Sequence, residues 1–273
     1  MYYIVSVYMI VLLKKYIVSE LNIVKLLTMC FCNSAFFLNV AEGANNRDVI
    51  TRTFTVQLGA TRVIYNPESS GATLTVTNQQ NYPMLVQSEV LSEDQKSRAP
   101  FIITPPLFRL DAQQSSKLRI VRTGGNFQED RETLQWICVK GIPPKNDDIW
   151  ARDTSGKESS QNSISLQLQF SVNSCIKMFI RPSSLKGNPD DFANRIYWEK
   201  HGDKLKGNNP TPFYMNISEL SVGNKKISHR HYIPPFSSYE FDYPKSATGQ
   251  IQWRVMTDYG ISGKNNQAAI KNH

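Results

Sequence analysis

The sequence predicts an all-β protein made of two β-sandwich domains, the first of immunoglobulin type. From residue 48 onward, short alternating runs of β-branched and aromatic residues are broken about every ten residues by Gly, Pro, Asn or Asp. No amphipathic helix of normal length stands out among them. With 273 residues, 40% of them apolar, the chain is long enough for two domains that each have a core.

The first domain is predicted to contain seven strands, each a run of alternating or β-branched residues bounded by turn residues. They are expected at 49–58 running on through 62–65, and at 72–77, 85–91, 101–110, 117–122, 134–139 and 163–180. Seven strands in about 130 residues match one immunoglobulin-like domain.

A second, smaller β-sandwich is predicted after a linker. Residues 183–188 follow Arg181-Pro182 and contain Gly and Asn, and Pro ends a ladder while Gly and Asn favour turns. Further strands are expected at 195–199, 213–220, 226–232, 239–241 and 251–257, with a loose polar tail at 260–273. The domain boundaries are therefore predicted at 45–182 and 183–273.

The N-terminus is predicted to be a secretory signal peptide, residues 1–44. Its two apolar stretches, 2–13 and 26–40, are each shorter than the ~20 residues that span a bilayer. The second stretch follows Lys25 and precedes the small-residue segment 40–44, which is the layout of a cleavable signal. We expect the mature chain to begin near residues 42–46. The alternative is a membrane-anchoring helix that stays attached.

Cysteine usage fits an exported protein. Cys30 and Cys32 lie in the expected signal peptide, which leaves Cys138 and Cys175 in the mature chain. An even pair in an exported protein is read more simply as a disulfide than as a metal site or a nucleophile.

The sequence contains few motifs that indicate catalysis, metal binding or nucleic-acid binding. The sequence has no phosphate loop, nucleophile elbow, zinc-protease or dinucleotide motif. His229 and His231 share a strand face, but no Cys, Asp or Glu stands at zinc-like spacing beside them, so we interpret them as surface residues near a hairpin. The net charge of +8 is spread along the chain without a dense basic run. We therefore expect no enzyme activity, cofactor, metal or nucleic acid.

One strand has an unusual polar face. In residues 163–172 the apolar side chains alternate perfectly with small, uncharged ones, and the apolar row is Ile164, Leu166, Leu168, Phe170 and Val172. Such a strand is suited to lie between two partners. The alternative is an ordinary half-buried strand, which the pattern by itself favours.

Residues 127–144 carry the most specific motif. The order of an apolar residue, an acidic and a basic residue, then Glu132-Thr-Leu-x-Trp136-x-Cys138-Val, then Ile142-Pro143, resembles the signature of the periplasmic pilus-assembly chaperones, the PapD-like family. Gln128 departs from the more usual Pro or Ala. Family-like blocks extend the resemblance over almost all of residues 48–260: 61–65, 104–110, 175–182, 209–216, 231–235 and 253–260.

The cysteine pair and the long stretch 141–162 resemble the long-loop branch of this family, similar to the chaperones of capsular antigen and pH 6 antigen fimbriae. The resemblance implies a periplasmic protein with two immunoglobulin-like domains in a boomerang arrangement. It also places Cys138 and Cys175 on adjacent strands that flank the loop.

The resemblance further implies a mechanism. Chaperones of this family lend a strand to a fimbrial subunit that lacks its own last strand, a form of β-augmentation, and deliver the subunit to an outer-membrane usher. The implied roles are donor strand for Ile164, Leu166, Leu168, Phe170 and Val172, anchor of the subunit's C-terminal carboxylate for Arg62 and Lys177, and interdomain charge cluster for Glu132, Arg181 and Asp258. The free chaperone is expected to shield the donor surface by self-association.

Two other classes of protein remain open at this point. A secreted adhesin or fibre subunit would have one incomplete domain and an N-terminal donor extension. An enzyme would turn over a substrate without any fibre subunit, and no residue cluster indicates which substrate.

Overall fold

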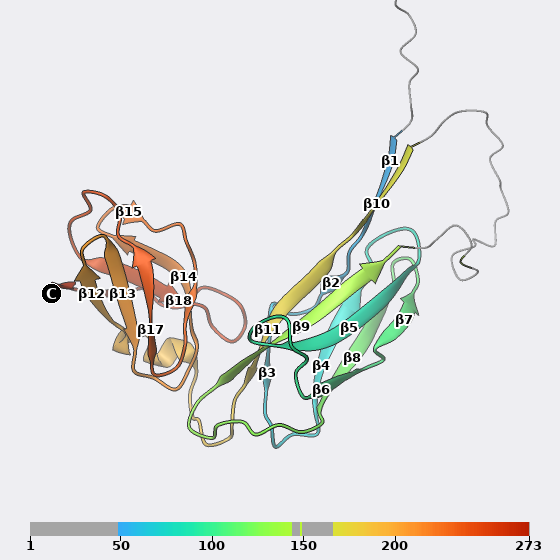
Figure 1. The fold of residues 1–273 in the computed structure, drawn as a ribbon, viewed down its shortest axis with the longest axis horizontal. Coiled ribbons are helices and arrows are strands. Elements are labelled where there is room, and N and C mark those ends of the chain that lie inside the picture. Colours follow the sequence, from blue (N-terminus) through green and yellow to red (C-terminus); the bar gives the residue numbers. More distant parts are fainter. Residues whose placement is uncertain (1–48, 144–147, 149–165, 273) are drawn as a thin grey trace, which may run out of the picture. The chain divides into compact units, whose positions relative to one another are not determined.

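The computed structural model describes residues 49–143, 148 and 166–272, in which strands dominate (Figure 1). The expected signal peptide, the donor-strand residue Ile164 and most of the stretch 141–162 lie outside these residues. The described strands enclose two separate hydrophobic cores, one built from residues 54–180 and the other from residues 193–255. The predicted fold class, two immunoglobulin-like β-sandwiches, is confirmed.

The first sandwich has a five-stranded sheet in the order β3-β11-β9-β5-β7 and a four-stranded sheet in the order β2-β4-β8-β6. Along β5 the residues Met84, Val86 and Val90 are buried in the core, as the two-residue period of a strand requires. The strands are β2 Gln57–Leu58, β3 Arg62–Tyr65, β4 Ala72–Thr77, β5 Met84–Ser92, β6 Phe101–Thr104, β7 Leu107–Leu110, β8 Ser115–Arg122, β9 Thr133–Ile142 and β11 Asn173–Ile180.

The second sandwich combines the sheet β17-β13-β12-β20 with the sheet β15-β14-β18-β19, where β16 also pairs with β14. Trp198 and Trp253 meet edge to face in its core, with ring centroids 5.6 Å apart. The strands are β12 Tyr197–His201, β13 Lys204–Asn209, β14 Met215–Val222, β15 Lys225–Lys226, β16 Tyr232–Ile233, β17 Ser237–Asp242, β18 Ile251–Val255, β19 Asn266–Ala268 and β20 Lys271–Asn272.

Four runs that the sequence predicts as single strands are each divided. The run 49–58 with 62–65 becomes β1 (Val49–Phe54), β2 and β3, and of the run 226–232 only the two ends lie in strands, β15 and β16. The run 101–110 becomes β6 and β7, which pair with β8 and β5 in different sheets, because Pro105 and Pro106 between them have no N–H to continue a ladder. The run 163–180 becomes β10 (Leu166–Ser171) and β11. They are separated by Val172, whose N–H donates to the carbonyl of Phe54 at 3.0 Å.

Strand β10 pairs with β1 (Val49–Phe54) in a two-stranded sheet that belongs to neither sheet of the sandwich (Figure 1). This ribbon meets the sandwich at Gly141 of β9, whose N–H donates to the carbonyl of Val172. A side chain at Gly141 would overlap the carbonyl of Phe54, so glycine permits the two strands to approach closely there.

Several elements of the second domain have no clear signal in the sequence. Strand β13 and the short 3₁₀-helix η2 (Pro189–Arg195) were not predicted, and the tail that was expected to be loose contributes β19 and β20. The expectation of a loose tail was wrong because backbone hydrogen bonds to β18 and β12 hold these short strands, whatever their polar side chains.

Candidate functional site

The face of the five-stranded sheet that points away from its core carries the two predicted anchor residues, Arg62 and Lys177. Arg62 of β3 lies opposite Lys177 of β11 in a parallel pair, and Lys177 lies opposite Trp136 of β9 in an antiparallel pair. The neighbouring residues Val63, Met178 and Ile137 face the core instead. Because side chains alternate along a strand, Arg62, Lys177 and Trp136 form one row across three strands.

Lys177 is held by groups from both domains. Its Nζ donates to Oδ1 of Asn216 at 2.5 Å and lies 4.6 Å from the centre of the Tyr232 ring and 5.8 Å from that of Trp136. Burial, together with the nearby charge of Arg62, lowers the pKa of Lys177 to about 8. The ammonium is therefore poorly solvated, and an anion beside it would be strongly favoured.

Arg62 shares this environment. Within the described part of the chain its Nε is buried and has no hydrogen-bond partner, and burial lowers the pKa of the guanidinium. The charges of Asp258 and Glu132 oppose that shift, but both carboxylates accept hydrogen bonds from Arg181. A buried donor without a partner is costly, so Arg62 is ready to bind an incoming acceptor.

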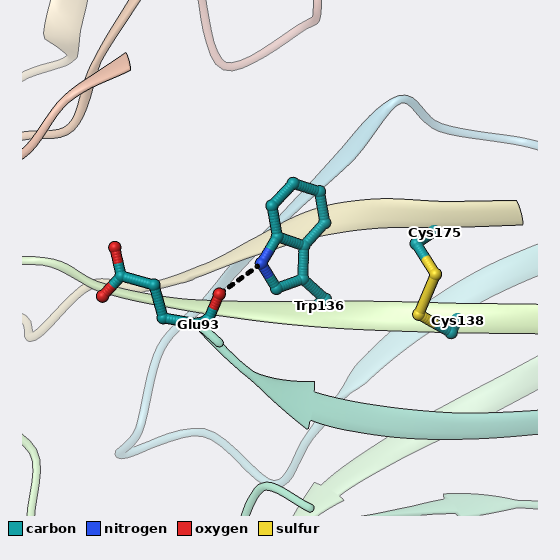
Figure 2. The surroundings of a disulfide bond; sticks show 4 residues. All are labelled: Glu93, Trp136, Cys138 and Cys175. Atoms are coloured by element: carbon teal, nitrogen blue, oxygen red, sulfur yellow. Dashed lines mark hydrogen bonds between the residues drawn. A yellow bond between two sulfur atoms is a disulfide. The ribbon is translucent and has the colours of Figure 1, made fainter. Parts of the chain in front are cut away.

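The disulfide lies on the same face of the sheet. Cys138 of β9 and Cys175 of β11 are directly opposite each other and are joined, as the resemblance implies (Figure 2). They stand two residues from Trp136 and Lys177 on the same pair of strands. Since a slip of one residue would move every side chain to the other face, a covalent link here fixes the register that places Lys177 beside Trp136.

Glu132, Arg181 and Asp258 form a connected charge cluster. Arg181 donates through Nε to Glu132 at 2.7 Å and through both Nη atoms to the two oxygens of Asp258 at 2.6 and 2.7 Å. The second oxygen of Glu132 accepts the backbone N–H of Tyr214 at 2.8 Å. The cluster thus links the residues next to β9 and β11 to those before β14 and after β18, with one guanidinium between two carboxylates.

A second polar link, centred on Glu93, has no signal in the sequence. The carboxylate of Glu93 accepts the hydroxyls of Tyr214 at 3.3 Å and Tyr232 at 3.2 Å. The indole of Trp136 donates to the backbone carbonyl of Glu93 at 3.3 Å (Figure 2). Burial and Glu93 raise the pKa of Tyr232 to about 12, so its hydroxyl stays a donor. Tyr214 and Tyr232 belong to blocks that the sequence marked as family-like, but their partner does not.

The predicted donor strand leads into the strand that carries Lys177. Phe170 is 52% exposed, and Leu168 and Val172 are 38% and 37% exposed. Leu166 belongs to β10, but its side chain and the whole of Ile164 lie outside the description. A row of exposed large apolar side chains on a strand that no sandwich sheet includes is a surface suited to a protein partner.

Other kinds of site find little support in the described residues. No group of three or more His, Cys, Asp or Glu side chains among them is placed to hold a metal ion. His229 and His231 stack at 6.0 Å beside Tyr239 on the second sandwich. Among all the residues that the structure describes, no helix has the length and apolar character needed to cross a bilayer.

Comparison with known proteins gives a consistent result. The family model described as "Pili and flagellar-assembly chaperone, PapD N-terminal domain" matches residues 55–186. The model described as "Pili assembly chaperone PapD, C-terminal domain" matches residues 191–267. Together the two matches cover both sandwiches except for the end of β19 and β20.

Individual relatives agree with the family models. The chain is 57% identical over 234 residues to chaperone protein AggD of Escherichia coli, which covers 85% of this chain and 92% of AggD. It is similar to the crystal structure of the E. coli chaperone DraB, with 58% identity, a TM-score of 0.72, and coverage of 82% of this chain and 100% of DraB. It also matches a chain in the solved complex of Salmonella enterica SafA pilin with the SafB chaperone, with 47% identity, a TM-score of 0.72, and coverage of 81% and 99%. The chain with this fold and this paired Arg62–Lys177 face therefore belongs to the PapD-like family of pilus-assembly chaperones.

Proposed function

We propose that this chaperone captures fimbrial subunits in the periplasm, completes their fold with strand β10, and delivers them to an outer-membrane usher. The observation that carries the proposal is the pairing of Arg62 and Lys177 across β3 and β11. Two partly buried cations side by side repel each other, and burial lowers the pKa of both. A carboxylate placed between them relieves the repulsion and makes charge-assisted hydrogen bonds.

The C-terminus of a polypeptide is a carboxylate at a fixed place in the chain. Anchoring it on Arg62 and Lys177 sets the register of everything that precedes it. Because β11 continues from β10 through Val172, a subunit anchored at Lys177 and extended along the ribbon meets the exposed side chains of Leu168 and Phe170. The SafA–SafB complex is a precedent for a related chaperone bound to a pilin.

The apolar row of β10 supplies affinity. Burying Leu168, Phe170 and Val172 in a subunit groove contributes roughly 1.5 to 3 kcal/mol for each side chain, before the costs of association and ordering. Backbone N–H and C=O groups of the strand complete the subunit's ladder. Binding alone accounts for this function, so no catalytic residue enters it.

Export completes the proposal. Residues 1–44 act as a cleaved signal peptide, the chaperone domains occupy 45–182 and 183–273, and the mature protein works in the periplasm. The apolar stretch 26–40 with its small-residue end supports this role. The periplasm is also where a disulfide such as Cys138–Cys175 persists.

Coexpression tests the proposal. The full chain is produced with candidate fimbrial subunits encoded beside it, and periplasmic extracts are examined for a one-to-one complex. We expect the complex with the wild-type chain and with the control Lys140→Ala, which removes an exposed lysine of β9. We expect Arg62→Ala and Lys177→Ala to fold, because neither opens a core cavity, and to lose the complex. Normal recovery of complex from both variants would overturn the anchor assignment.

A further inference from the structure

An exposed aromatic side chain stands on a tight turn after β18. Tyr259 is 91% exposed, and Ile261, two residues on, is 64% exposed. These are the two highest exposures among the large hydrophobic side chains of the described residues. Two such side chains around one glycine, Gly260, are a feature that the second core does not explain.

The turn that carries them is fixed on both sides. Asp258 is held by the two Nη atoms of Arg181, and the N–H of Gly260 donates to the carbonyl of Thr257 at 3.0 Å. The N–H of Thr257 donates in turn to the carbonyl of Ile261 at 2.8 Å. A side chain presented on a fixed backbone loses little entropy when it binds a partner.

The turn also lies against the first domain beside the carboxylate anchor. A Cβ at Gly260 would overlap Oγ1 of Thr61, and the residue has a φ of +79°, so glycine is required both by the contact and by the backbone. Thr61 directly precedes Arg62. Asp258, next to Tyr259, is close enough for its charge to act on the guanidinium of Arg62.

The geometry points to Tyr259, with Ile261, as a contact surface for the last few residues of the captured subunit, those that immediately precede its C-terminal carboxylate. This inference rests on the proposed function, which places that carboxylate on Arg62 and Lys177. An extended chain advances only about 3.3 to 3.6 Å per residue, so the residues next to a carboxylate anchored at Arg62 lie within reach of the turn beside it. Tyr259 then selects for apolar or aromatic side chains at the subunit's C-terminus.

The test uses the subunit recovered by coexpression, in complex with the full-length chaperone. Dissociation is followed as exchange of the subunit onto an excess of tagged wild-type chaperone. We expect Tyr259→Ala to speed dissociation by about 5- to 30-fold, as for an aromatic residue at the centre of an interface, and Tyr259→Phe to be close to wild type. Thermal unfolding of the free Tyr259→Ala chaperone should be unchanged, because the side chain is exposed.

Two controls separate the possible outcomes. Tyr197→Ala removes a tyrosine of β12 that is 43% exposed and distant in sequence from the anchor, and it should leave dissociation unchanged. When the subunit's last apolar residues are replaced by alanine, the wild-type chaperone and Tyr259→Ala should release it at the same rate. Wild-type dissociation from Tyr259→Ala, or a defect only in delivery to the usher, overturns the inference. If Arg62→Ala and Lys177→Ala both still capture the subunit, the proposed anchor fails. If both lose the subunit while Tyr259→Ala dissociates like wild type, only this inference fails.

Discussion

Lys177 and Arg62 occupy directly opposite positions on the parallel strands β11 and β3, so two cationic side chains share one face of the sheet. Neighbouring strands are about 4.7 to 4.9 Å apart, a spacing at which like charges destabilise each other. Asn216 and the ring of Tyr232 hold the ammonium, but neither carries a negative charge. The pair therefore favours binding of an anion, and in the free chaperone the neighbours of Lys177 compensate only part of the repulsion between the two cations.

Subunit capture should depend on pH through Lys177. Burial lowers its pKa to about 8, whereas a bound carboxylate favours the ammonium form. Between about pH 8 and the usual lysine pKa near 10.5, the unfolded chain holds more protons at Lys177 than the folded chaperone does. The free energy of unfolding of the free chaperone should therefore be lowest where Lys177 is charged and rise with pH over this range. Capture has the opposite sign: above pH 8 it takes up a proton and should weaken by about tenfold per pH unit.

The measurement is the dissociation constant of the complex between pH 6.5 and 9.5. Lys177→Arg is the matched control, because an arginine keeps its charge over this range and its affinity should not change with pH through this site. An equal loss of affinity in the arginine variant would show that another group titrates.

A charge on the donor strand should separate binding from folding. Leu168 is 38% exposed, so Leu168→Asp should change the free energy of unfolding by only about 0.5 kcal/mol while placing an unpaired charge in the complex. Gln169→Asp, an exposed change at the next position, should capture subunits nearly as well as wild type. Melting and capture are measured on one preparation, with sedimentation to detect a lost self-association. A globally unfolded Leu168→Asp protein would overturn the donor-strand assignment.

The disulfide should stabilise the first domain. Cys138 and Cys175 are separated by 37 positions, and closing a loop of that size contributes about 2 to 4 kcal/mol in the chain-entropy model. The double variant Cys138→Ala, Cys175→Ala should lose that much in urea unfolding, and reductant should shift the wild-type midpoint in the same direction but not that of the variant. Mass spectrometry of periplasmic protein should find no free thiol at either position.

Breaking the charge cluster should be more damaging than removing a surface ion pair. The side chain of Glu132 is 1% exposed, so Arg181→Ala leaves a buried carboxylate unpaired and should cost about 3 to 5 kcal/mol. Lys204→Ala, which removes the exposed pair with Asp242, should cost less than about 1 kcal/mol. Urea unfolding of both variants checks the contrast, and equal losses would contradict the importance of the buried cluster.

The sequence by itself determined the fold class and the family, and it supplied the pair Arg62 and Lys177 that we propose as the anchor. Strands such as β5 and β8 show a two-residue alternation of buried and exposed positions, and the block around Trp136 and Cys138 is long enough to be specific. The local pattern did not predict strands whose formation depends on their pairing partners. Pro105 and Pro106 divide one run between two sheets. The polar residues of β19 form a strand only because β18 offers backbone groups for pairing.

Only the tertiary structure decided what surrounds the site. Glu93 meets Tyr214 and Tyr232, which are more than 120 positions away, and no spacing rule connects them. The contact of Gly260 with Thr61 likewise joins two domains at loops. Such contacts depend on how two folded surfaces pack against each other. The periodicity of a single strand carries no information about this long-range packing.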